Sequence, residues 1–388
     1  MAGDQRPESV RGKIVKRCSR CILPESYPSI TFDKEGTCNY CRDSTRFHYR
    51  SEEDLHRILA RFRHKGKYDC IVALSGGRDS AFVAYYAVKE LGLNVLAVTC
   101  DNGFMPEQTK ANVTNTVERL GIDHINLSYD YVKDHVKDFA SSWIHKPSPA
   151  MIAFLCNGCV TGVRECLTQA AYDNNVSLIL GGGGGVVGYG GEPEQSFAEK
   201  LLSVSDSNGK IGRPLFLLAG FLAQLVKNPS YFQPACLASF AREFLHRFWY
   251  GYNRDLEVLG LFEFIPWNED EVVSTVQNEL KWGKPDYRKT SWRADCKIHF
   301  LKDYLYGKTL AFTKNDELLS GMIREGMITR EGALKRLEND DYLSKQFLTE
   351  FLRELGLELH GLDVALAEYQ KKLPTHIRVE VSEKWKGS

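Results

Sequence analysis

Two groups of residues in this sequence have the types and spacing to do chemistry: a turn rich in glycine and serine, and cysteines that occur in pairs. The turn reads Ser75-Gly76-Gly77-Arg78-Asp79-Ser80. Adjacent glycines let the backbone pass close to phosphate oxygens, and the amides that open a following helix donate to negative charge. Ser75 and Ser80 add hydroxyl donors. The turn predicts a phosphate-binding site, and because it lacks the Gly-x-x-x-x-Gly-Lys pattern of a Walker A loop, hydrolysis at the γ-phosphate is not expected.

The segments around the turn alternate between strand-like and helix-like patterns. Strands are expected at 70–74, 95–99, 124–127 and 176–180, and helices at 79–91, 107–120 and 160–174. This alternation predicts an α/β fold with a doubly wound parallel sheet, in which ligands bind outside the carboxyl ends of the strands. Ser75, Asp101 and Gly181 would lie at that edge. The glycine run 181–185, which includes Gly182 and is followed by further glycines at 188, 190 and 191, is expected to form a functional loop.

With a strand before it and a helix after it, the turn resembles the PP-loop of the adenine nucleotide α-hydrolases, a superfamily with a HUP-like fold. Enzymes of that superfamily split ATP into AMP and pyrophosphate. A second strand that ends in Thr99-Cys100-Asp101-Asn102-Gly103 strengthens the resemblance. The resemblance implies that residues 75–80 hold the pyrophosphate, that Asp79 belongs to a metal–phosphate site with Mg²⁺, and that Asp101 contacts the nucleoside. Gly181 and Gly182 complete the predicted ATP site.

Four cysteines near the start of the chain have the spacing of a zinc knuckle. Cys18-x-x-Cys21 and Cys38-x-x-Cys41 are separated by sixteen residues, so two tight turns can aim four sulfurs at one Zn²⁺ ion. A closed site of four thiolates leaves no open position for chemistry. The expected role is therefore structural.

The knuckle and the end of the chain resemble one enzyme family. Segments 17–21 and 38–41, followed by the PP-loop, are similar to the start of the N-acetyl sugar amidotransferases of surface-polysaccharide biosynthesis. The stretch 319–332 resembles the terminal helical segment of that family. The resemblance implies that ATP activates an acetamido oxygen and that ammonia replaces it, which gives an acetamidino group.

The middle of the chain departs from that family and resembles the tRNA 2-thiolation enzymes of the same superfamily. Cys156-Asn157-Gly158-Cys159 lies about eighty residues after the PP-loop, and Asp295-Cys296 follows downstream. This resemblance implies that Cys156, Cys159 and Cys296 hold a 4Fe–4S cluster with one iron left open, and Asp295 would be a proton carrier beside the third ligand. The alternatives are a redox or persulfide pair at 156 and 159, or three thiols without a shared role. The remaining cysteines are expected to be small buried hydrophobes: Cys70, Cys100, Cys166 and Cys236.

Length and composition set limits on the remaining possibilities. The 388 residues suffice for two to three domains, and we expect a zinc knuckle at 14–45, a PP-loop domain at 50–200, a lid region that completes the substrate site at 201–313, and a helical cap at 314–388. Fifty basic and fifty acidic residues give zero net charge, which disfavours a tRNA acceptor because phosphate contacts need clustered Lys and Arg. Without an apolar signal core or a run of 18 apolar residues, we expect a cytoplasmic protein with no membrane span.

Two hypotheses for the function share adenylation of a carbonyl or amide oxygen and differ in the nucleophile that displaces AMP. The three cysteines favour sulfur, and the resemblance at both flanks favours ammonia. A sulfur route would need a sulfur-donor protein, and an ammonia route would need a separate glutaminase because none is visible in the sequence. The expected acceptor is a small molecule or a sugar, and a homodimer is compatible with the sequence. A third hypothesis is a non-catalytic nucleotide-binding module, which would release no pyrophosphate.

Overall fold

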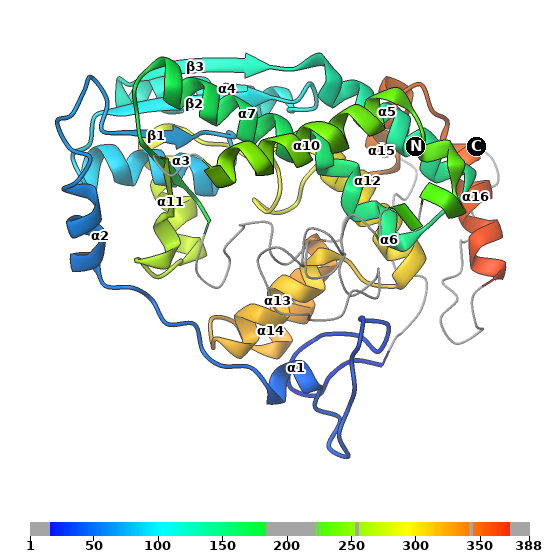
Figure 1. Cartoon of the computed structure of the whole chain (residues 1–388). Coiled ribbons are helices and arrows are strands. Elements are labelled where there is room, and N and C mark those ends of the chain that lie inside the picture. Colours follow the sequence, from blue (N-terminus) through cyan, green and yellow to red (C-terminus); the bar gives the residue numbers. More distant parts are fainter. Residues whose placement is uncertain (1–15, 184–221, 224, 253–255, 341–343, 373–388) are drawn as a thin grey trace, which may run out of the picture.

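A computed structural model describes residues 16–183, 222–223, 225–252, 256–340 and 344–372. Its centre is a five-stranded sheet with the order β3-β2-β1-β4-β5, in which every neighbouring pair is parallel (Figure 1). The strands are β1 Cys70–Ala73, β2 Val95–Asp101, β3 Asp123–Ser128, β4 Leu178–Gly181 and β5 Glu257–Gly260. This order is that of a doubly wound sheet and confirms the predicted fold class.

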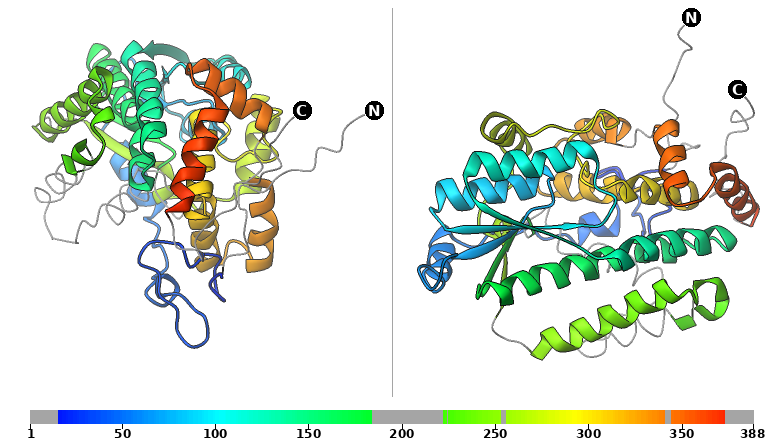
Figure 2. Two further views of the ribbon diagram at one scale, coloured as in Figure 1. Left: turned by 90° about the vertical axis from the view of Figure 1, so that its right-hand side faces the viewer. Right: turned by 90° about the horizontal axis from the view of Figure 1, so that it is seen from above.

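Helices cover both faces of the sheet (Figure 2). One face is covered by α3, α4 and α11, and the other by α7, which is flanked by α5 and α10. The bounds are α3 Arg78–Tyr85, α4 Glu107–Leu120, α5 Asp130–His145, α7 Asn157–Asp173, α10 Pro234–Tyr252 and α11 Glu269–Leu280. Within β1, Val72 packs toward α3 while its neighbour Ile71 packs toward α7. Both faces of the strand are buried, which explains its continuous apolar sequence.

Several elements lie outside the sequence prediction. The fifth strand, β5, comes from the region expected to form a lid, and it pairs with β4 over Leu178–Gly181. Helices α5, α10 and α11 were also not predicted. The predicted helix 79–91 is α3 followed by a π-helical turn at Tyr86–Glu90. The chain therefore devotes more of its middle part to the sheet domain than the hydrophobic patterns alone indicate.

The C-terminal part is helical, as expected. Its helices are α12 Ile298–Leu310, α13 Lys314–Arg324, α14 Arg330–Asp340, α15 Lys345–Glu354 and α16 Leu359–Lys371. Shorter helices complete the described chain: α1 Asn39–Arg42, α2 Glu52–Leu59 and α6 Pro149–Ile152. The knuckle segment lies beside α13 and α14, on the side of these helices away from the sheet (Figure 1). A second apolar core joins the knuckle to α5, α12, α15 and α16.

One continuous helical stretch, 149–173, is long and apolar enough by composition to cross a bilayer. Its residues Ala170 and Ala171 pack against Ile71, Leu96 and Ile179 of the sheet. The core helix of a globular domain passes the same test of length and hydropathy.

Helix α7 is held in place by a buried histidine of α5. The His135 ring accepts a hydrogen bond at Nδ1 from the Ser239 hydroxyl (2.6 Å) and donates from Nε2 to the Phe154 carbonyl (3.1 Å). A Cβ on Gly158 would lie 2.9 Å from this ring, so only glycine allows the close approach of α7. Both ring nitrogens are satisfied by a neutral imidazole, and burial lowers the His135 pKa to about 4.

Replacement of His135 by Gln is expected to flatten the loss of stability in acid. The His135 pKa of about 4 in the folded chain lies below its value in the unfolded chain. Between about pH 6.5 and pH 4, His135 is therefore protonated in the unfolded chain but neutral in the folded chain. The free energy of unfolding should therefore fall by about 3 kcal/mol over this interval through His135 alone. Urea titrations at several pH values would measure the difference between wild type and His135→Gln. His56→Gln, at an exposed histidine, is the control variant. If the free energy of unfolding depends on pH in the same way in wild type and in His135→Gln, His135 is not a buried neutral imidazole.

Candidate ATP site and cysteine groups

The backbone of the phosphate turn is fixed by contacts on both sides of Gly76. This residue has φ +78°, and a Cβ there would lie 2.5 Å from the Thr109 carbonyl oxygen. The Gly76 carbonyl accepts hydrogen bonds from Trp282 Nε1 (3.0 Å) and Asn112 Nδ2 (3.2 Å). Glycine is required because a side chain would meet backbone at a positive φ. The turn is thus set by α4 and by residues far along the chain.

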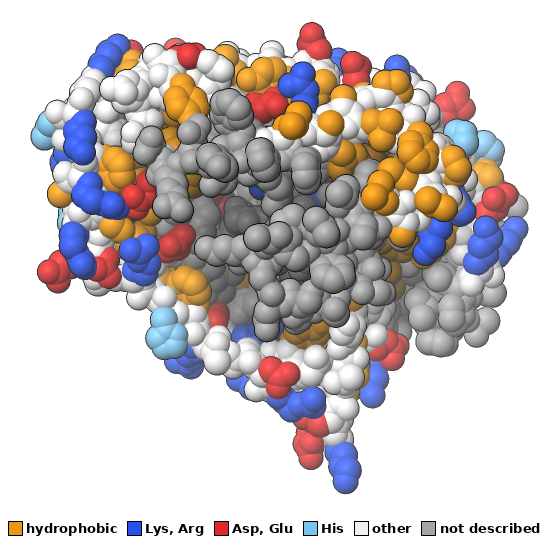
Figure 3. Space-filling view, viewed as in Figure 1, with side chains coloured by type: hydrophobic (Ala, Val, Ile, Leu, Met, Phe, Trp, Pro, Cys, Tyr) orange, Lys and Arg blue, Asp and Glu red, His pale blue; other side chains and the backbone are white. Residues whose placement is uncertain are grey.

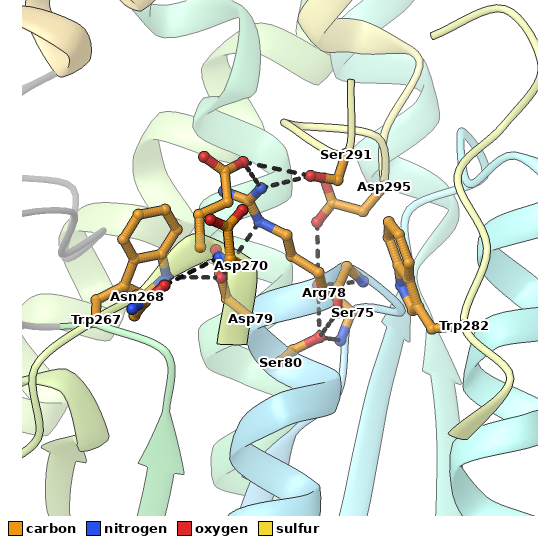
Figure 4. A network of polar contacts seen from close by, with 12 residues as sticks. Ser75, Arg78, Asp79, Ser80, Trp267, Asn268, Asp270, Trp282, Ser291 and Asp295 are labelled. Carbon is orange, nitrogen blue, oxygen red and sulfur yellow. Dashed lines mark hydrogen bonds and ion pairs between the residues drawn. The ribbon is translucent and has the colours of Figure 1, made fainter. Parts of the chain in front are cut away.

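The two serines of the turn face an aspartate 220 residues away. Ser75 Oγ donates to Asp295 Oδ2 (3.0 Å) and lies 3.1 Å from Ser80 Oγ. A Cβ on Gly77 would lie 3.2 Å from the same carboxylate oxygen. Figure 4 shows the Asp295 carboxylate directed at Ser75 and Ser80. The structure thus brings Asp295, expected beside a cysteine, to the predicted pyrophosphate site.

Arg78 turns its guanidinium away from the two serines and toward a buried ion-pair network (Figure 4). Its Nη1 donates to Glu269 and to Ser291 Oγ (2.5 Å), and Arg336 of α14 donates to the same Glu269 carboxylate. Only 2% of Arg78 is exposed. Nη1 is occupied by these partners, whereas Nη2 is buried and has no hydrogen-bond partner among the described residues, so the protein satisfies only part of the guanidinium.

Two tryptophan rings cover the buried guanidinium of Arg78. Its central carbon lies 5.1 Å from the ring centroid of Trp267 and 4.8 Å from that of Trp292. Trp267 also donates from Nε1 to Asp79 Oδ1 (3.0 Å). Cation–π contacts of this kind gain strength when the cation is desolvated. The rings therefore fix both charged residues that open α3.

Asp79 is the predicted metal–phosphate carboxylate, and it lies among other charges. Burial raises its pKa, while the neighbouring guanidinium of Arg78 opposes the shift and Asp295 adds to it. The Cβ that Gly182 lacks would lie 3.4 Å from Asp79 Cβ. Two carboxylates near one phosphate turn offer the hard oxygen ligands that Mg²⁺ prefers.

These residues enclose a cavity of about 310 Å³. It is lined by Ala73, Ser75, Gly77, Arg78, Asp79, Ser80, Gly182, Gly183, Ser291, Trp292, Arg293, Ala294, Asp295 and His299. Of the other predicted ATP-site residues, Asp101 and Gly181 end β2 and β4, at the same edge of the sheet. The predicted glycines from 184 onward lie outside the described residues.

Two of the three cysteines predicted to act together contact the same asparagine, Asn102. Cys156 precedes α7, Cys159 lies in its first turn, and Cys296 lies just before α12. Asn102 Nδ2 is 3.4 Å from Cys296 Sγ and 3.8 Å from Cys159 Sγ. Burial, reinforced by the Cys156 thiol nearby, raises the pKa of Cys296 to about 12 and that of Cys159 well above its usual value. A buried thiol becomes a thiolate when a nearby cation compensates its negative charge.

The four N-terminal cysteines form one compact, buried group. Cys18 Sγ lies 4.0 Å from Cys41 Sγ, and Cys21 Sγ lies 3.8 Å from Cys38 Sγ. Four ligands at about 2.3 Å around a tetrahedral zinc ion are separated by about 3.8 Å. The backbone amide of Cys38 donates to Cys18 Sγ (3.2 Å). The group has the size and donor set for a single tetrahedral ion.

The knuckle docks on the hairpin of α13 and α14. Arg330 donates from Nε to the carbonyls of Cys18 (3.2 Å) and Cys21 (3.0 Å). The Ile22 amide donates to Ser320 Oγ of α13 (3.3 Å). The two stretches that carry the amidotransferase resemblance, 17–21 and 319–332, are therefore in contact.

The other cysteines lie within the sheet domain and α10. Cys70, Cys166 and Cys236 are buried, and Cys100 at the end of β2 is half-buried. The Cys166 thiol forms a hydrogen bond with the Cys100 thiol, which together with burial raises the Cys166 pKa.

Sequence reasoning missed several residues that shape the site. Glu269 pairs with Arg78 across 191 positions, and Trp267 and Trp282 contact the turn from similar separations. The local sequence around these residues contains no pattern that predicts such pairs. Asn102 carries a weak signal, because it directly follows a strand that ends at the ligand-binding edge of the sheet.

The segment that contains the turn matches a known family. Residues 53–154, about a quarter of the chain, match the family model described as NAD synthase. An uncharacterised protein of Methanocaldococcus jannaschii is 27% identical over 120 residues, which cover 30% of this chain and 43% of that protein. The chain thus spans less than half the length of this curated relative.

Several solved structures are similar at low identity. The U34-tRNA thiolase of Methanococcus maripaludis, solved with its 4Fe–4S cluster, is 15% identical with a TM-score of 0.32, and the match covers 84% of this chain and 89% of that chain. The NH₃-dependent NAD synthetase of Campylobacter jejuni is 18% identical with a TM-score of 0.27, over 53% of this chain and 97% of that one. The NMN synthetase of Francisella tularensis is 17% identical with a TM-score of 0.28, over 62% and 100%.

The strand–turn–helix geometry at 70–85 and the family match meet in the same segment of the chain. The resemblance inferred from residues 75–80 is confirmed at the level of the superfamily. The chain carries a nucleotide-binding domain of the PP-loop ATP pyrophosphatase superfamily.

Proposed function

We propose that this protein uses ATP to activate a carbonyl or amide oxygen of a small molecule or sugar and replaces that oxygen by sulfur. The supporting observation is the segment 291–296, which reaches two sites at once. Asp295 accepts a hydrogen bond from Ser75 of the PP-loop, and Cys296 lies 3.4 Å from Asn102 beside Cys159. Consecutive residues thus connect a phosphate site to a group of thiols. This arrangement suits a reaction in which ATP adenylates a substrate oxygen and sulfur then attacks the carbon that carries this oxygen.

In the first step, the PP-loop residues would bind the triphosphate of ATP. Five residues of the turn line the cavity: Ser75, Gly77, Arg78, Asp79 and Ser80. Asp79 and Asp295 are the residues that would hold Mg²⁺, because their carboxylates lie nearest the turn. The substrate oxygen attacks the α-phosphorus, a new P–O bond forms, and pyrophosphate leaves. The product is an adenylated carbon with AMP as its leaving group.

The second step needs a sulfur nucleophile, which a sulfur-donor protein would deliver at the oxidation level of sulfide. Cys156, Cys159 and Cys296 would hold a 4Fe–4S cluster, which when bound by three thiolates leaves one iron open to bind that sulfide. The three sulfurs do not all lie within 4.8 Å of one another, whereas the four knuckle sulfurs do. Thiolates on different irons are farther apart than thiolates on one ion, so the wider group fits a cluster better than a single metal ion. Sulfur at the oxidation level of sulfide forms the C–S bond, and AMP leaves with the original oxygen, so no net redox change occurs.

Ammonia is the second candidate nucleophile. It would attack the same adenylated carbon, form a C–N bond and release AMP, which gives an acetamidino group from an N-acetyl sugar. The contact between 17–21 and 319–332 favours this alternative, because both stretches resemble the sugar amidotransferases. A glutaminase partner would then supply the ammonia.

Zn²⁺ in the knuckle would have a structural role. The four cysteines leave no position for substrate, and the group docks on α13 and α14 rather than at the cavity. Binding of an ion by residues that are apart in the unfolded chain contributes directly to folding.

The proposed class of acceptor substrate is based on the charge of the chain rather than on a specific contact. The chain has zero net charge, and basic and acidic side chains are interspersed on the face in Figure 3. Sustained phosphate contacts with tRNA need clustered cations. A small molecule or sugar acceptor is therefore part of the proposal.

Asp79→Ala is expected to reduce pyrophosphate release by roughly 10²-fold, because it removes a charge positioned at the metal–phosphate group. A coupled pyrophosphate assay with saturating ATP measures this. Asp173→Ala removes an exposed aspartate of α7 and should leave the rate unchanged. Full activity of folded Asp79→Ala would refute the assignment.

Cys18→Ser is expected to lose bound zinc and to lower the melting temperature, since a structural metal stabilises the fold directly. Metal analysis and thermal denaturation measure the two effects. Cys236→Ala, at a buried thiol outside the knuckle, should reduce stability but keep one equivalent of zinc. The knuckle assignment fails if Cys18→Ser retains both its zinc and its melting temperature.

Protein purified without oxygen is expected to carry a brown iron–sulfur chromophore. The chromophore should disappear in Cys156→Ala, Cys159→Ala and Cys296→Ala and survive in Cys38→Ala, because only the first three belong to the wider group. Iron and sulfide analysis with the visible spectrum measures this. Protein that binds no iron but consumes ATP when given ammonia and an N-acetyl sugar would replace the sulfur proposal with the amidotransferase one.

A further inference from the structure

Asn102 follows β2 and lies between two of the three cysteines. The Phe104 amide donates to Asn102 Oδ1 (2.9 Å), which closes a short turn after the strand. An amide side chain has one oxygen and one nitrogen, so this contact assigns the other atom. Nδ2 is the atom that lies 3.4 Å from Cys296 Sγ and 3.8 Å from Cys159 Sγ.

The turn at Asn102 is held in place by contacts with Lys297 and with helix α15. The Lys297 amide, directly after Cys296, donates to the Phe104 carbonyl (3.0 Å). Phe104 is buried against Phe351 of α15, with ring centroids 5.6 Å apart. The asparagine therefore has little freedom to turn away from the sulfurs. Its two N–H groups suffice for two acceptors.

We propose that Asn102 is a positioning residue for the sulfur chemistry, whose amide holds Cys159 and Cys296 together and donates hydrogen bonds to their anionic sulfurs. This inference rests on the proposed function. Hydrogen bonds to a charged acceptor are about twice as strong as neutral ones, so the two contacts would hold the sulfurs most firmly when these serve as metal ligands. On a bound cluster, donors to the sulfurs stabilise the more negative, reduced state and make the reduction potential less negative.

A purely structural role in the turn is the alternative, and two substitutions separate it from the proposal. Asn102→Asp has the same shape and keeps an oxygen for the Phe104 amide, but replaces the donor with a charged acceptor. Asn102→Ser keeps an oxygen acceptor for the turn, but it shortens the side chain and replaces two N–H donors by one hydroxyl proton. Asn102→Asp therefore loses both hydrogen bonds to sulfur, and Asn102→Ser can form at most one. Asn126→Asp, on the exposed side of neighbouring β3, repeats the charge change away from the cysteines.

The first measurement uses the full chain free of iron and under reducing conditions. Mass spectrometry would follow the alkylation of Cys159 and Cys296 by iodoacetamide at one pH, since the thiolate is the reactive form. Loss of a hydrogen bond to a charged group should slow both rates by about tenfold in Asn102→Asp, with a smaller effect in Asn102→Ser. Asn126→Asp should match wild type, and thermal melts would confirm that all variants fold.

The second measurement is the reduction potential of the reconstituted cluster, which should become more negative in Asn102→Ser and more so in Asn102→Asp. Unchanged alkylation rates in folded variants would overturn the role of Asn102, whatever the metal content. If wild type binds no iron but the alkylation rates change as expected, Asn102 keeps its role toward the thiols while the cluster proposal fails.

Discussion

The buried guanidinium of Arg78 constrains much of this structure. A guanidinium does not lose its charge, and a buried charge is costly unless it is paired. Glu269 must therefore open α11 next to the PP-loop, and two tryptophan rings close over the cation. The carboxylate of Glu269 also accepts from Arg336, which brings α14 to the same place. A residue that belongs to the ATP motif thus fixes three segments far away in the sequence.

Helix α14 connects this ion pair to the knuckle. Arg330, its first residue, donates to carbonyls of the cysteine turns, and Arg336, less than two turns later, donates to Glu269. The knuckle lies away from the sheet, yet a single helix links it to the PP-loop. A metal in the knuckle would therefore stabilise the position of Arg336 and, through Glu269, of Arg78. The four-cysteine group and the PP-loop are thus linked through α14 and Glu269.

Local sequence patterns predicted the elements whose signals are contiguous. The apolar run before Ser75, the glycine pair and the two Cys-x-x-Cys turns each carry their information within a few residues, and the alternation of strands and helices predicted a parallel sheet. Strand β5 is as short as β1 and β4, but its sequence Glu-Val-Leu-Gly lacks the continuous apolar run that identifies those two strands. The contact between Asp295 and Ser75 joins positions 220 residues apart, and packing rather than any local preference determines it. Pairs of this kind, Arg78 with Glu269 among them, require the tertiary structure.

The two cysteine groups differ in spacing and in the donors that contact their sulfurs. In the knuckle, four sulfurs lie at the spacing of tetrahedral ligands, and backbone amides donate to the sulfurs of Cys18 and Cys21. In the second group, Cys159 and Cys296 come from two elements, and the donor between them is the side chain of Asn102. The three sulfurs of this group do not all lie within 4.8 Å of one another, so they are more widely spaced than those of the knuckle. Because Asp295 directly precedes Cys296 and accepts a hydrogen bond from Ser75, the chain between these two residues couples the position of this group to that of the PP-loop.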